Sequence, residues 1–401
     1  MHPVYDEPPV LQNTTKNGKL YYAGGDDVDP KINLVHMYGS AYDMGKAFGE
    51  LVGAEMEMFM KEVLQWIEQK ADEQVHILPK PIQNEFIKEG VFAALDLTAE
   101  LTKPYTPQHF FQEMQGMADG SGIPYQNILR VNMIPELIKA SCSMFGAWGE
   151  AIEKTDGTLI QLRALDWNMD GPFQKYPMAA VYHPTDGGVP FMNVGYLGLI
   201  GSLTGYSSSP VGICEKVWIH YDGNYSRAGY PWHFLLRDIL QFDQDIDSAL
   251  TRIADADRTC SIFVGVGDGE SNTFKALEYS HDYIEIWNDK NFPAYDNHPL
   301  MNGLVYLDKH TQPSTSDPCF TELLEFYYGQ IDAHVTMQNI TAQFVTGETH
   351  AAVYDYGANT VYVSNAQVYD PKTAPNPQPA CARQYTKFDM TSLFLEEPPI
   401  M

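Results

Sequence analysis

Apolar residues follow a helical period in the first third of the chain. In the segment 38–69 they recur at positions 44, 48, 51, 52, 56, 59, 60, 63, 64 and 67, which predicts a long helix with one apolar face. Two further helical patterns cover 84–101 and 107–122, and the second ends in glycines that suit a helix stop. We therefore expect residues 1–137 to be largely helical.

The first predicted helix carries two further signals. Ser40, followed three residues later by Asp43, predicts a capping box at its start. Gly45, Gly49 and Gly53 are spaced four apart and form one stripe along the helix. In a helix this rich in charge, such a stripe indicates close packing against another backbone in a soluble domain and not a membrane dimer.

The period changes to short strand-like runs from Cys142 onward. These runs lie at 143–152, 158–167, 178–196, 259–280 and 350–368. A pair of helical patterns at 230–243 and 245–256 interrupts them. Because no linker-like composition separates the blocks, we expect one large α+β domain in which helices cover mostly antiparallel sheets.

The composition argues against two classes of binding partner. The 25 basic and 52 acidic side chains of this 401-residue chain give a formal charge of −27, which repels phosphate backbones and anionic bilayers. The longest apolar windows are shorter than the roughly 18 residues that a membrane helix needs. We expect neither nucleic-acid binding nor a stable membrane span.

Five cysteines lie far apart in the sequence, at Cys142, Cys214, Cys260, Cys319 and Cys381. Without a CxxC pair or a His/Cys cluster, the sequence predicts no metal site and no cofactor. Either four of these cysteines pair and leave one reactive thiol, or all five are reduced and buried.

Location is indicated only by three glycosylation sequons, at Asn13, Asn224 and Asn339. They favour a secreted or lysosomal (vacuolar) glycoprotein, although a cytoplasmic protein of this acidity also fits the composition.

Two glycine- or serine-rich stretches have plain structural interpretations. The stretch 265–271 lies between two strand-like runs and lacks the following helix that a phosphate loop needs, so it is predicted to be a β-turn. The stretch 205–212 is interpreted as a loop, with the lining of a site as the alternative. The sequence contains neither HExxH nor GxSxG, which argues against zinc or serine-triad chemistry.

Cys142, Arg163 and Asp166 form the most informative group. If 142–152 and 158–167 pair as a hairpin across 154–157, the return strand brings Arg163 and Asp166 back toward Cys142. A guanidinium and a carboxylate beside the thiol would lower its pKa and orient a proton acceptor. Residues three apart face opposite sides of a regular strand, so both reach Cys142 only at a bulge or a strand end. The alternative is a buried structural cysteine.

These residues resemble the N-terminal-nucleophile (Ntn) hydrolases of the isopenicillin N acyltransferase type. Wider relatives of that family are penicillin V and bile-salt acylases, acid ceramidase, N-acylethanolamine acid amidase and phospholipase B-like proteins. The resembling segments are "YDMGKAFGELVGAE", "CSMFGAWG", "DGTLIQLRALDWNMDG", "TGYSSSPVGICEKVW", "GYPWHFLLRDIL", "GDGESNTFKALEYS" and "YDNHP". The resemblance implies a four-layered αββα fold and a precursor that cuts itself before the nucleophile, here between Ser141 and Cys142.

The resemblance also implies roles for four catalytic residues. Cys142 would supply both the thiolate and, after the cut, the α-amine that acts as the base, with an unperturbed pKa of about 7.7 to 8.0. Asp166 would orient that amine, Arg163 would contact the polar end of the substrate, and Asn297 would donate to the tetrahedral oxyanion. No histidine and no metal is then required.

A substrate site is predicted at Trp148, Trp167, Tyr206 and Ser207. Ser207 stands where the family often has an asparagine, and Ser141 stands where its fungal members often have glycine. Aromatic residues near Cys142 are expected to line an acyl pocket or to belong to the core. They are Phe145, Trp148, Trp167, Phe173 and Tyr176.

The implied activity is hydrolysis of a linear amide of a small N-acyl substrate, with a lipid amide among the candidates, through a Cys142 acyl-enzyme. One alternative is transfer of the acyl group to an amine, and another is a lysosomal or secreted binding protein that keeps the fold without catalysis. After the cut, an α chain of residues 1–141 and a β chain of residues 142–401 would stay together as a heterodimer within one globular domain.

Overall fold

The computed structural model describes most of the chain. The described residues are 4–25, 30–74, 83, 88–137, 140–155, 157–167, 169, 171–219, 221–310 and 317–400. Residues 84–87 of the second predicted helix and residue 156 of the predicted hairpin turn lie outside this set.

Ten strands of the described chain form one sheet. In spatial order they are β1 (Val10–Thr15), β2 (Gly18–Ala23), β3 (Ile32–Gly39), β6 (Pro177–Pro184), β7 (Phe191–Tyr196), β8 (Thr204–Ser207), β9 (Val211–Val217), β10 (Ser261–Asp268), β11 (Thr273–Ser280) and β12 (Ile284–Trp287). Neighbours are antiparallel except β3 and β6, which pair in parallel from Asn33↔Met178 to Gly39↔Pro184. Because β3 precedes Cys142 and β6 follows it, the two predicted fragments share one sheet.

Six strands of the described chain form a second, antiparallel sheet. In spatial order they are β13 (Leu304–Leu307), β4 (Ser141–Ala147), β5 (Ile160–Asp166), β14 (His350–Asp355), β15 (Thr360–Asn365) and β16 (Thr386–Asp389). The predicted hairpin is therefore present as β4 and β5, with a 3-10 helix, Gly149–Thr155, between them. The predicted turn at 265–271 falls at the end of β10 and the connection to β11, and the strand-like run 350–368 contains the hairpin of β14 and β15.

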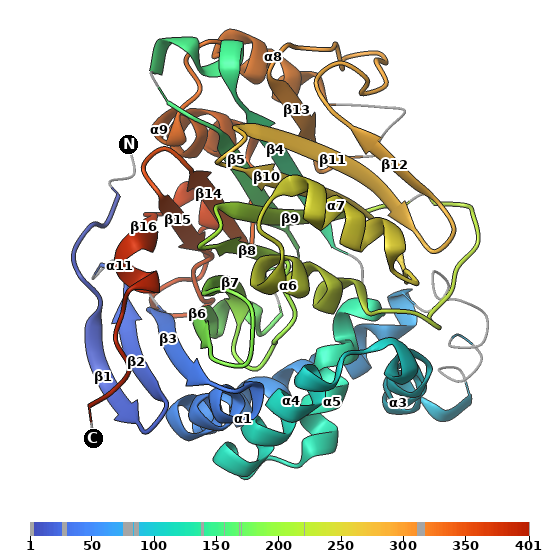
Figure 1. Ribbon diagram of the computed structural model, residues 1–401, viewed down its shortest axis with the longest axis vertical. Coiled ribbons are helices and arrows are strands. Elements are labelled where there is room, and N and C mark those ends of the chain that lie inside the picture. The colour runs from blue at the N-terminus through green and yellow to red at the C-terminus, as the bar shows by residue number, and fades with distance from the viewer. Residues whose placement is uncertain are drawn as a thin grey trace.

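Most helices lie outside both sheets, whereas Met390 and Leu393 of the short C-terminal helix pack into the core between the sheets. The described helices are α1 (Ala41–Gln74), α3 (Val91–Thr102), α4 (Gln108–Ser121), α5 (Tyr125–Met133), α6 (Trp232–Phe242), α7 (Ile246–Asp255), α8 (Pro318–Phe326), α9 (Ala333–Val335), α10 (Ala342–Phe344) and α11 (Met390–Phe394). Figure 1 shows α1, α4 and α5 at one end of the molecule and α8 and α9 at the other. No helix among the described residues is long and apolar enough to cross a membrane.

The glycine stripe of α1 packs against α4, as predicted. A side chain at Gly45 or Gly49 would collide with the backbone of Glu113 or Met117 on α4. Gly116 of α4 makes the reciprocal approach to the backbone of α1 at Tyr42. The capping interaction is also present, since the Asp43 N–H donates to Ser40 Oγ at 3.2 Å.

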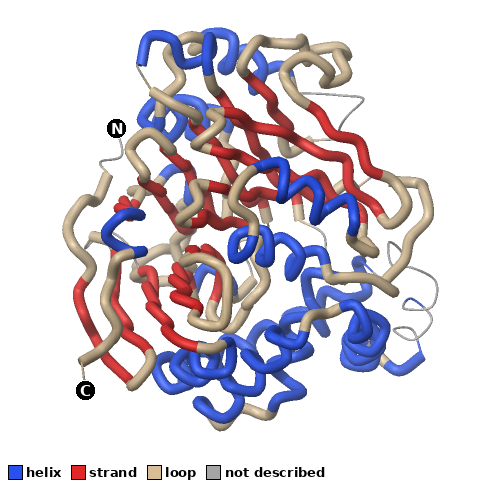
Figure 2. The backbone as a smooth tube through the Cα atoms, in the orientation of Figure 1, coloured by secondary structure: helices blue, strands red, loops and turns tan. Residues whose placement is uncertain are grey.

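Three layers of buried apolar side chains lie between the two sheets and between each sheet and its helices. Alternate residues of β4 show how: Met144 packs into the core between the two sheets, whereas Phe145 packs against Phe320 of α8 on the outer face. A third core lies between the ten-stranded sheet and α1, α4, α6 and α7. Figure 2 shows the strands gathered between the helical ends. The structure is thus the expected four-layered αββα arrangement with mostly antiparallel sheets.

The first forty residues differ from the helical expectation. They form β1, β2 and β3, and β2 and β3 pair along six residues from Gly18↔Met37 to Ala23↔Ile32. β1 is exposed and β3 is buried on both faces, so neither shows the alternation that identifies a half-buried strand.

Candidate active site

The hairpin of β4 and β5 decides which groups reach Cys142. In the register, Cys142 lies opposite Leu165, and Ser141 lies opposite Asp166, the last residue of β5. Side chains alternate, so Cys142 and Arg163 face the space between the sheets while Ser143 and Asp166 face the other way. The two predicted partners therefore approach Cys142 from opposite faces at the end of the strand.

The Cys142 thiol is completely buried. Its Sγ donates to Glu215 Oε1 of β9 at 3.8 Å. Burial raises the pKa of the Cys142 thiol; the charge of Arg163 opposes this shift, and Glu215 reinforces it. The expected lowering of this pKa is therefore wrong for the uncut chain, because desolvation of a thiolate outweighs one guanidinium that is already paired.

Arg163 forms a buried ion pair with Glu215. Its Nη2 lies 2.7 Å from Glu215 Oε1, and its Nε donates to the Leu203 carbonyl oxygen at 3.4 Å. Burial raises the pKa of Glu215, and Arg163 works against that rise. A guanidinium held in this way fixes the Glu215 carboxylate next to the thiol.

Asp166 is held from the other face by the loop after α10. Thr346 Oγ1 donates to Asp166 Oδ2 at 2.6 Å and lies 2.7 Å from Ser143 Oγ, while the Gly347 N–H donates to Oδ1 at 2.9 Å. Gly347 has φ +89°, a conformation that glycine adopts readily. Burial raises the pKa of Asp166 to about 6, against the effect of the Thr346 hydrogen bond.

Two lysines add positive charge in this otherwise acidic protein. Lys216 is buried, its Nζ donates to the His310 carbonyl oxygen at 3.2 Å, and burial lowers its pKa against the nearby charges of Cys142 and Asp308. Lys309 Nζ donates to the Val345 carbonyl oxygen at 2.7 Å, in the loop that holds Asp166. These two lysines and Arg163 lie among the carboxylates of Glu215, Asp166 and Asp308, so positive and negative charges are mixed around Cys142.

A small apolar cavity of about 50 Å³ adjoins this cluster. It is lined by Ile134, Pro135, Ala140, Leu165, Trp167, Phe173, Tyr196, Leu199, Leu203, Glu215, Val217 and Trp232. Trp167, one of the predicted substrate contacts, therefore lies in the wall of this cavity. Tyr196 lies 3.4 Å from His350 Nδ1, and Thr204 Oγ1 lies 2.9 Å from His350 Nε2.

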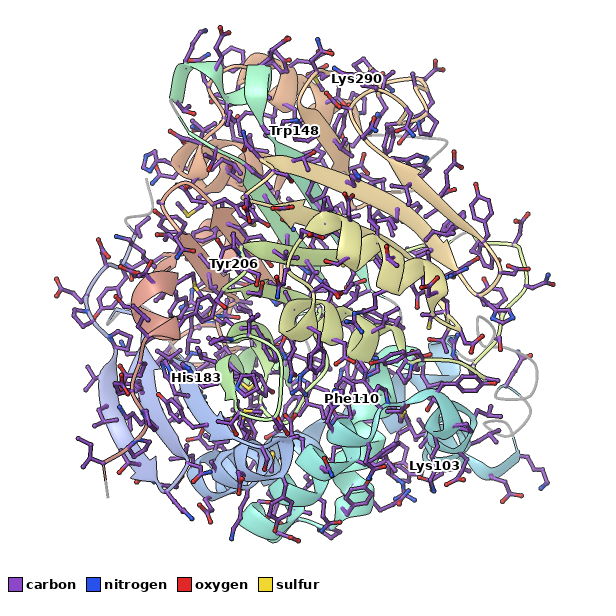
Figure 3. The ribbon with its side chains drawn as sticks, viewed as in Figure 1. Lys103, Phe110, Trp148, His183, Tyr206 and Lys290 are labelled. Atoms are coloured by element: carbon purple, nitrogen blue, oxygen red, sulfur yellow. The ribbon has the colours of Figure 1, made fainter. Side chains whose placement is uncertain are left out.

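The other predicted substrate contacts are not brought to Cys142. Trp148 follows the far end of β4, and Figure 3 shows it in the upper part of the molecule, well above Tyr206. Tyr206 packs in the core between the sheets and donates to Asn359 Oδ1 at 2.9 Å. Ser207 lies at the β8–β9 turn, where its Oγ accepts from the Val211 N–H at 3.4 Å. The stretch 205–212 is thus a hairpin.

Asn297 lies in an exposed turn with φ +61°. Its carbonyl oxygen accepts from Thr321 of α8 at 2.6 Å, on the helical side of the six-stranded sheet. The contacts that the structure gives Asn297 do not join it to Cys142.

Sequence reasoning missed Glu215, Lys216 and Thr346. One signal for the first two was available, because "VGICEKVW" places two adjacent charges inside an apolar strand-like run, where a buried charge needs a partner. Thr346 lies 180 residues from Asp166 and has no such local signal.

None of the five cysteines forms a disulfide, and four of them are buried. The lack of disulfides agrees with the second of the two interpretations given above, but the expected burial of all five is wrong for Cys319, which is exposed.

Two proteins of Dictyostelium discoideum are similar to this chain over nearly all of its length. Protein dcd1A is 44% identical over 413 residues, which cover 98% of this chain and 92% of dcd1A. Protein dcd1B is 42% identical over 416 residues, which cover 100% of this chain and 82% of dcd1B. Among solved structures, the Caenorhabditis elegans ortholog of N-acylethanolamine-hydrolyzing acid amidase matches with a TM-score of 0.40 and 14% identity, over 54% of this chain and 93% of that chain. No family model matches the chain.

Proposed function

The chain belongs to the family of the Dictyostelium dcd1 proteins, and from this premise we propose that it is a self-processing cysteine Ntn hydrolase of linear amides. The observation that carries the proposal is the position of Cys142 at the start of β4. Its thiol lies with Arg163 and Glu215 on one face, while Asp166 lies opposite Ser141 on the other. The backbone nitrogen of Cys142 lies in the plane of the sheet and not on either face. Asp166 can therefore hold the amine that forms at this nitrogen after the cut, although its side chain is on the face opposite the thiol.

The first step is the cut at Ser141–Cys142. Glu215 takes the proton of the buried thiol, and Sγ attacks the Ser141 carbonyl carbon. The peptide C–N bond breaks as a thioester forms, and the Cys142 nitrogen becomes an amine by gaining a proton. Water then hydrolyses the thioester, which gives a Ser141 carboxylate and restores the thiol. Glu215 suits the acceptor role because its Oε1 already accepts a hydrogen bond from Cys142 Sγ at 3.8 Å and because burial raises its pKa.

The second step is turnover of an N-acyl substrate by the freed terminus. The Cys142 α-amine accepts the thiol proton, the thiolate attacks the amide carbonyl, and the same proton leaves with the amine product. Water hydrolyses the acyl-enzyme. Asp166 orients the α-amine, and Asn297 remains the predicted side-chain donor to the oxyanion.

The apolar cavity supports an acyl group as the part of the substrate next to Cys142. At about 50 Å³ it is smaller than the roughly 150 Å³ of a cavity that binds benzene. Ile134, Pro135 and Ala140, which precede the cut, form part of its wall. The cut frees Ala140 to move, and the cavity can then widen for a longer acyl chain.

A secreted or lysosomal location is part of the proposal. Asn13 and Asn224 are exposed, as acceptors of a glycan must be, whereas Asn339 is half-buried in a π-helical turn. We expect glycans at the first two positions. A mass shift on deglycosylation of the native protein tests this.

An amide screen tests the proposed activity. The processed protein is assayed with N-acyl amino acids, N-acylethanolamines, ceramides and small N-acyl amines, each with and without an added amine nucleophile. Release of free acid that is lost in Cys142→Ala supports a hydrolase, and transfer of the acyl group to the added amine supports an acyltransferase. No turnover, together with a Cys142→Ala variant that keeps the biological effect, would support the non-catalytic binding protein.

A further inference from the structure

The turn after α10 has a conformation that its sequence does not favour. Val345, the residue after the helix, has φ +55° and ψ +49°, in the left-handed region that a β-branched residue rarely adopts. The Thr346 N–H donates to the Thr341 carbonyl oxygen at 3.2 Å, so the helix ends in a Schellman motif, where glycine normally takes the left-handed position. The Val345 side chain is exposed, so its burial does not hold the turn. Another contact has to stabilise this conformation.

Lys309, two residues after β13, makes such a contact. Its Nζ donates to the Val345 carbonyl oxygen at 2.7 Å and lies 5.3 Å from the centroid of the Phe344 ring, at the end of α10. The first is a charge-assisted hydrogen bond, and the second is a cation–π contact. The Asp308 carboxylate accepts from the His310 N–H at 2.7 Å, which fixes the backbone that carries Lys309. One ammonium group thus holds both the helix end and the left-handed residue.

The next two residues of the turn hold Asp166. Thr346 and Gly347 supply the hydroxyl and N–H donors described above, at 2.6 and 2.9 Å from the carboxylate oxygens. Both donors follow Val345 directly, so a change in the φ and ψ of Val345 would displace both of them from Asp166. The position of Asp166 at the end of β5 therefore depends on the contact between Lys309 and Val345.

Lys309 also acts on the charge of Asp166. Burial raises the pKa of Asp166; the Thr346 hydrogen bond and Lys309 work against that rise, and Glu348 of the same turn adds to it. The other titratable groups that interact electrostatically with Asp166 are Cys142, Lys216 and Cys381. Lys309 thus favours the ionised carboxylate, which is the form that can hold an amine.

We propose that Lys309 is a positioning residue of the active site. It holds the turn at Val345, the turn holds Asp166 through Thr346 and Gly347, and Asp166 stays beside the nitrogen of Cys142. This assignment rests on the proposed hydrolase function. Because Lys309 acts through the turn and not on the reacting atoms, its loss slows the chemical step and leaves substrate binding unchanged.

A kinetic comparison with p-nitroacetanilide tests the assignment. This chromogenic linear amide has an acetyl group that suits the small apolar cavity. Lys309 is half-buried at the surface, so Lys309→Met leaves the core intact. We expect Lys309→Met to lower kcat about 10- to 100-fold with KM unchanged, because Asp166 loses its position.

A second exchange at Val345 supplies a matched pair. Adding Val345→Gly to Lys309→Met is expected to raise kcat again, because glycine adopts the left-handed conformation without strain. Adding Val345→Ala, which keeps Cβ, is expected to leave kcat low. Wild-type kcat in Lys309→Met, a loss confined to KM, or equal kcat in the two double variants overturns the assignment.

Hydrogen exchange tests the turn without catalysis. The measurement uses the Cys142→Ala chain and follows the Gly347 amide, which donates to Asp166. Lys309→Met is expected to speed this exchange at least about 10-fold, the further change Val345→Gly to slow it again, and the amides of α7 to keep their rates. Unchanged exchange at Gly347, or an equal acceleration in α7, refutes the assignment. The expected exchange pattern in a protein that leaves the probe intact would retain the role of Lys309 in the turn and reject the hydrolysis of this probe.

Discussion

Asp166 is expected to destabilise the folded chain at neutral pH. Burial raises its pKa from 3.8 to about 6, so the folded state prefers the neutral carboxyl. For an acid with a raised pKa, stability falls as pH rises from the unfolded value through the folded one. At about 1.36 kcal/mol per pKa unit, the penalty is about 1.6 kcal/mol near pH 5 and about 3 kcal/mol near pH 7.5.

The Asp166→Asn exchange removes this penalty while keeping the size of the side chain. We expect the stability difference between Asp166→Asn and its parent to shift in favour of the variant by about 1.4 kcal/mol between roughly pH 5 and pH 7.5, a range that lies above the pI of about 4.6. The parent is the Cys142→Ala chain, which stays uncut, and denaturation midpoints are compared at each pH. The hydrogen bonds lost in the variant change its stability by the same amount at every pH. The part of the stability difference that varies with pH therefore reports the charge of Asp166 alone.

Asp96 supplies a control of opposite sign. The hydrogen bond from Arg130 holds the pKa of Asp96 below its usual value, with Nη2 at 2.6 Å from Oδ2. Its ionised form therefore stabilises the fold, and this effect is complete above the unfolded pKa of 3.8, so Asp96→Asn is expected to be less stable than the parent by an amount that does not change between roughly pH 5 and pH 7.5. If the Asp166→Asn difference is as flat with pH as the Asp96→Asn difference, or changes with pH against the variant, the account of the buried carboxyl is refuted.

Three further exchanges test other parts of the account. Arg163→Met leaves Glu215 as a buried unpaired charge and is expected to lower the free energy of unfolding by about 3 to 5 kcal/mol in denaturation experiments. The Arg163→Met/Glu215→Leu double variant is expected to recover this stability. An equal loss in the single and double variants would count against the ion pair. Gly116→Ala forces α4 away from the α1 backbone and is expected to cost about 1 to 3 kcal/mol, whereas the exposed Gln112→Ala on the same helix costs little. Asn297→Ala is expected to lower kcat about 100-fold if Asn297 donates to the oxyanion, and wild-type kcat would remove it from the mechanism.

Much of the fold follows from periodicity and turn chemistry. The long helix, its glycine contact with α4 and the β4–β5 hairpin could be predicted because each depends on residues close in sequence. Strands β1 and β3 could not, since β1 is exposed and β3 is buried on both faces, which leaves no alternation to detect.

Within the candidate site, only the residues that the β4–β5 hairpin brings together could be predicted from the sequence. β5 brings Arg163 and Asp166 back toward Cys142. Because they are three residues apart, they lie on opposite faces of the hairpin, and both come near Cys142 because it lies at the strand end. Glu215 and Thr346 arrive from a different sheet and from a distant loop, so only the tertiary fold places them. The pKa of the thiol could not be predicted either, because it depends on how deeply the folded chain buries Cys142.

The central claim is that the chain cuts itself before Cys142, and the N-terminal sequence of the purified protein tests it most directly. The account predicts that the 45.1 kDa chain separates under denaturing conditions into two fragments, one of which begins Cys-Ser-Met-Phe, and that Cys142→Ala remains a single chain. A mature, active wild-type preparation that consists of one intact polypeptide, or a cut that persists in Cys142→Ala, would contradict it.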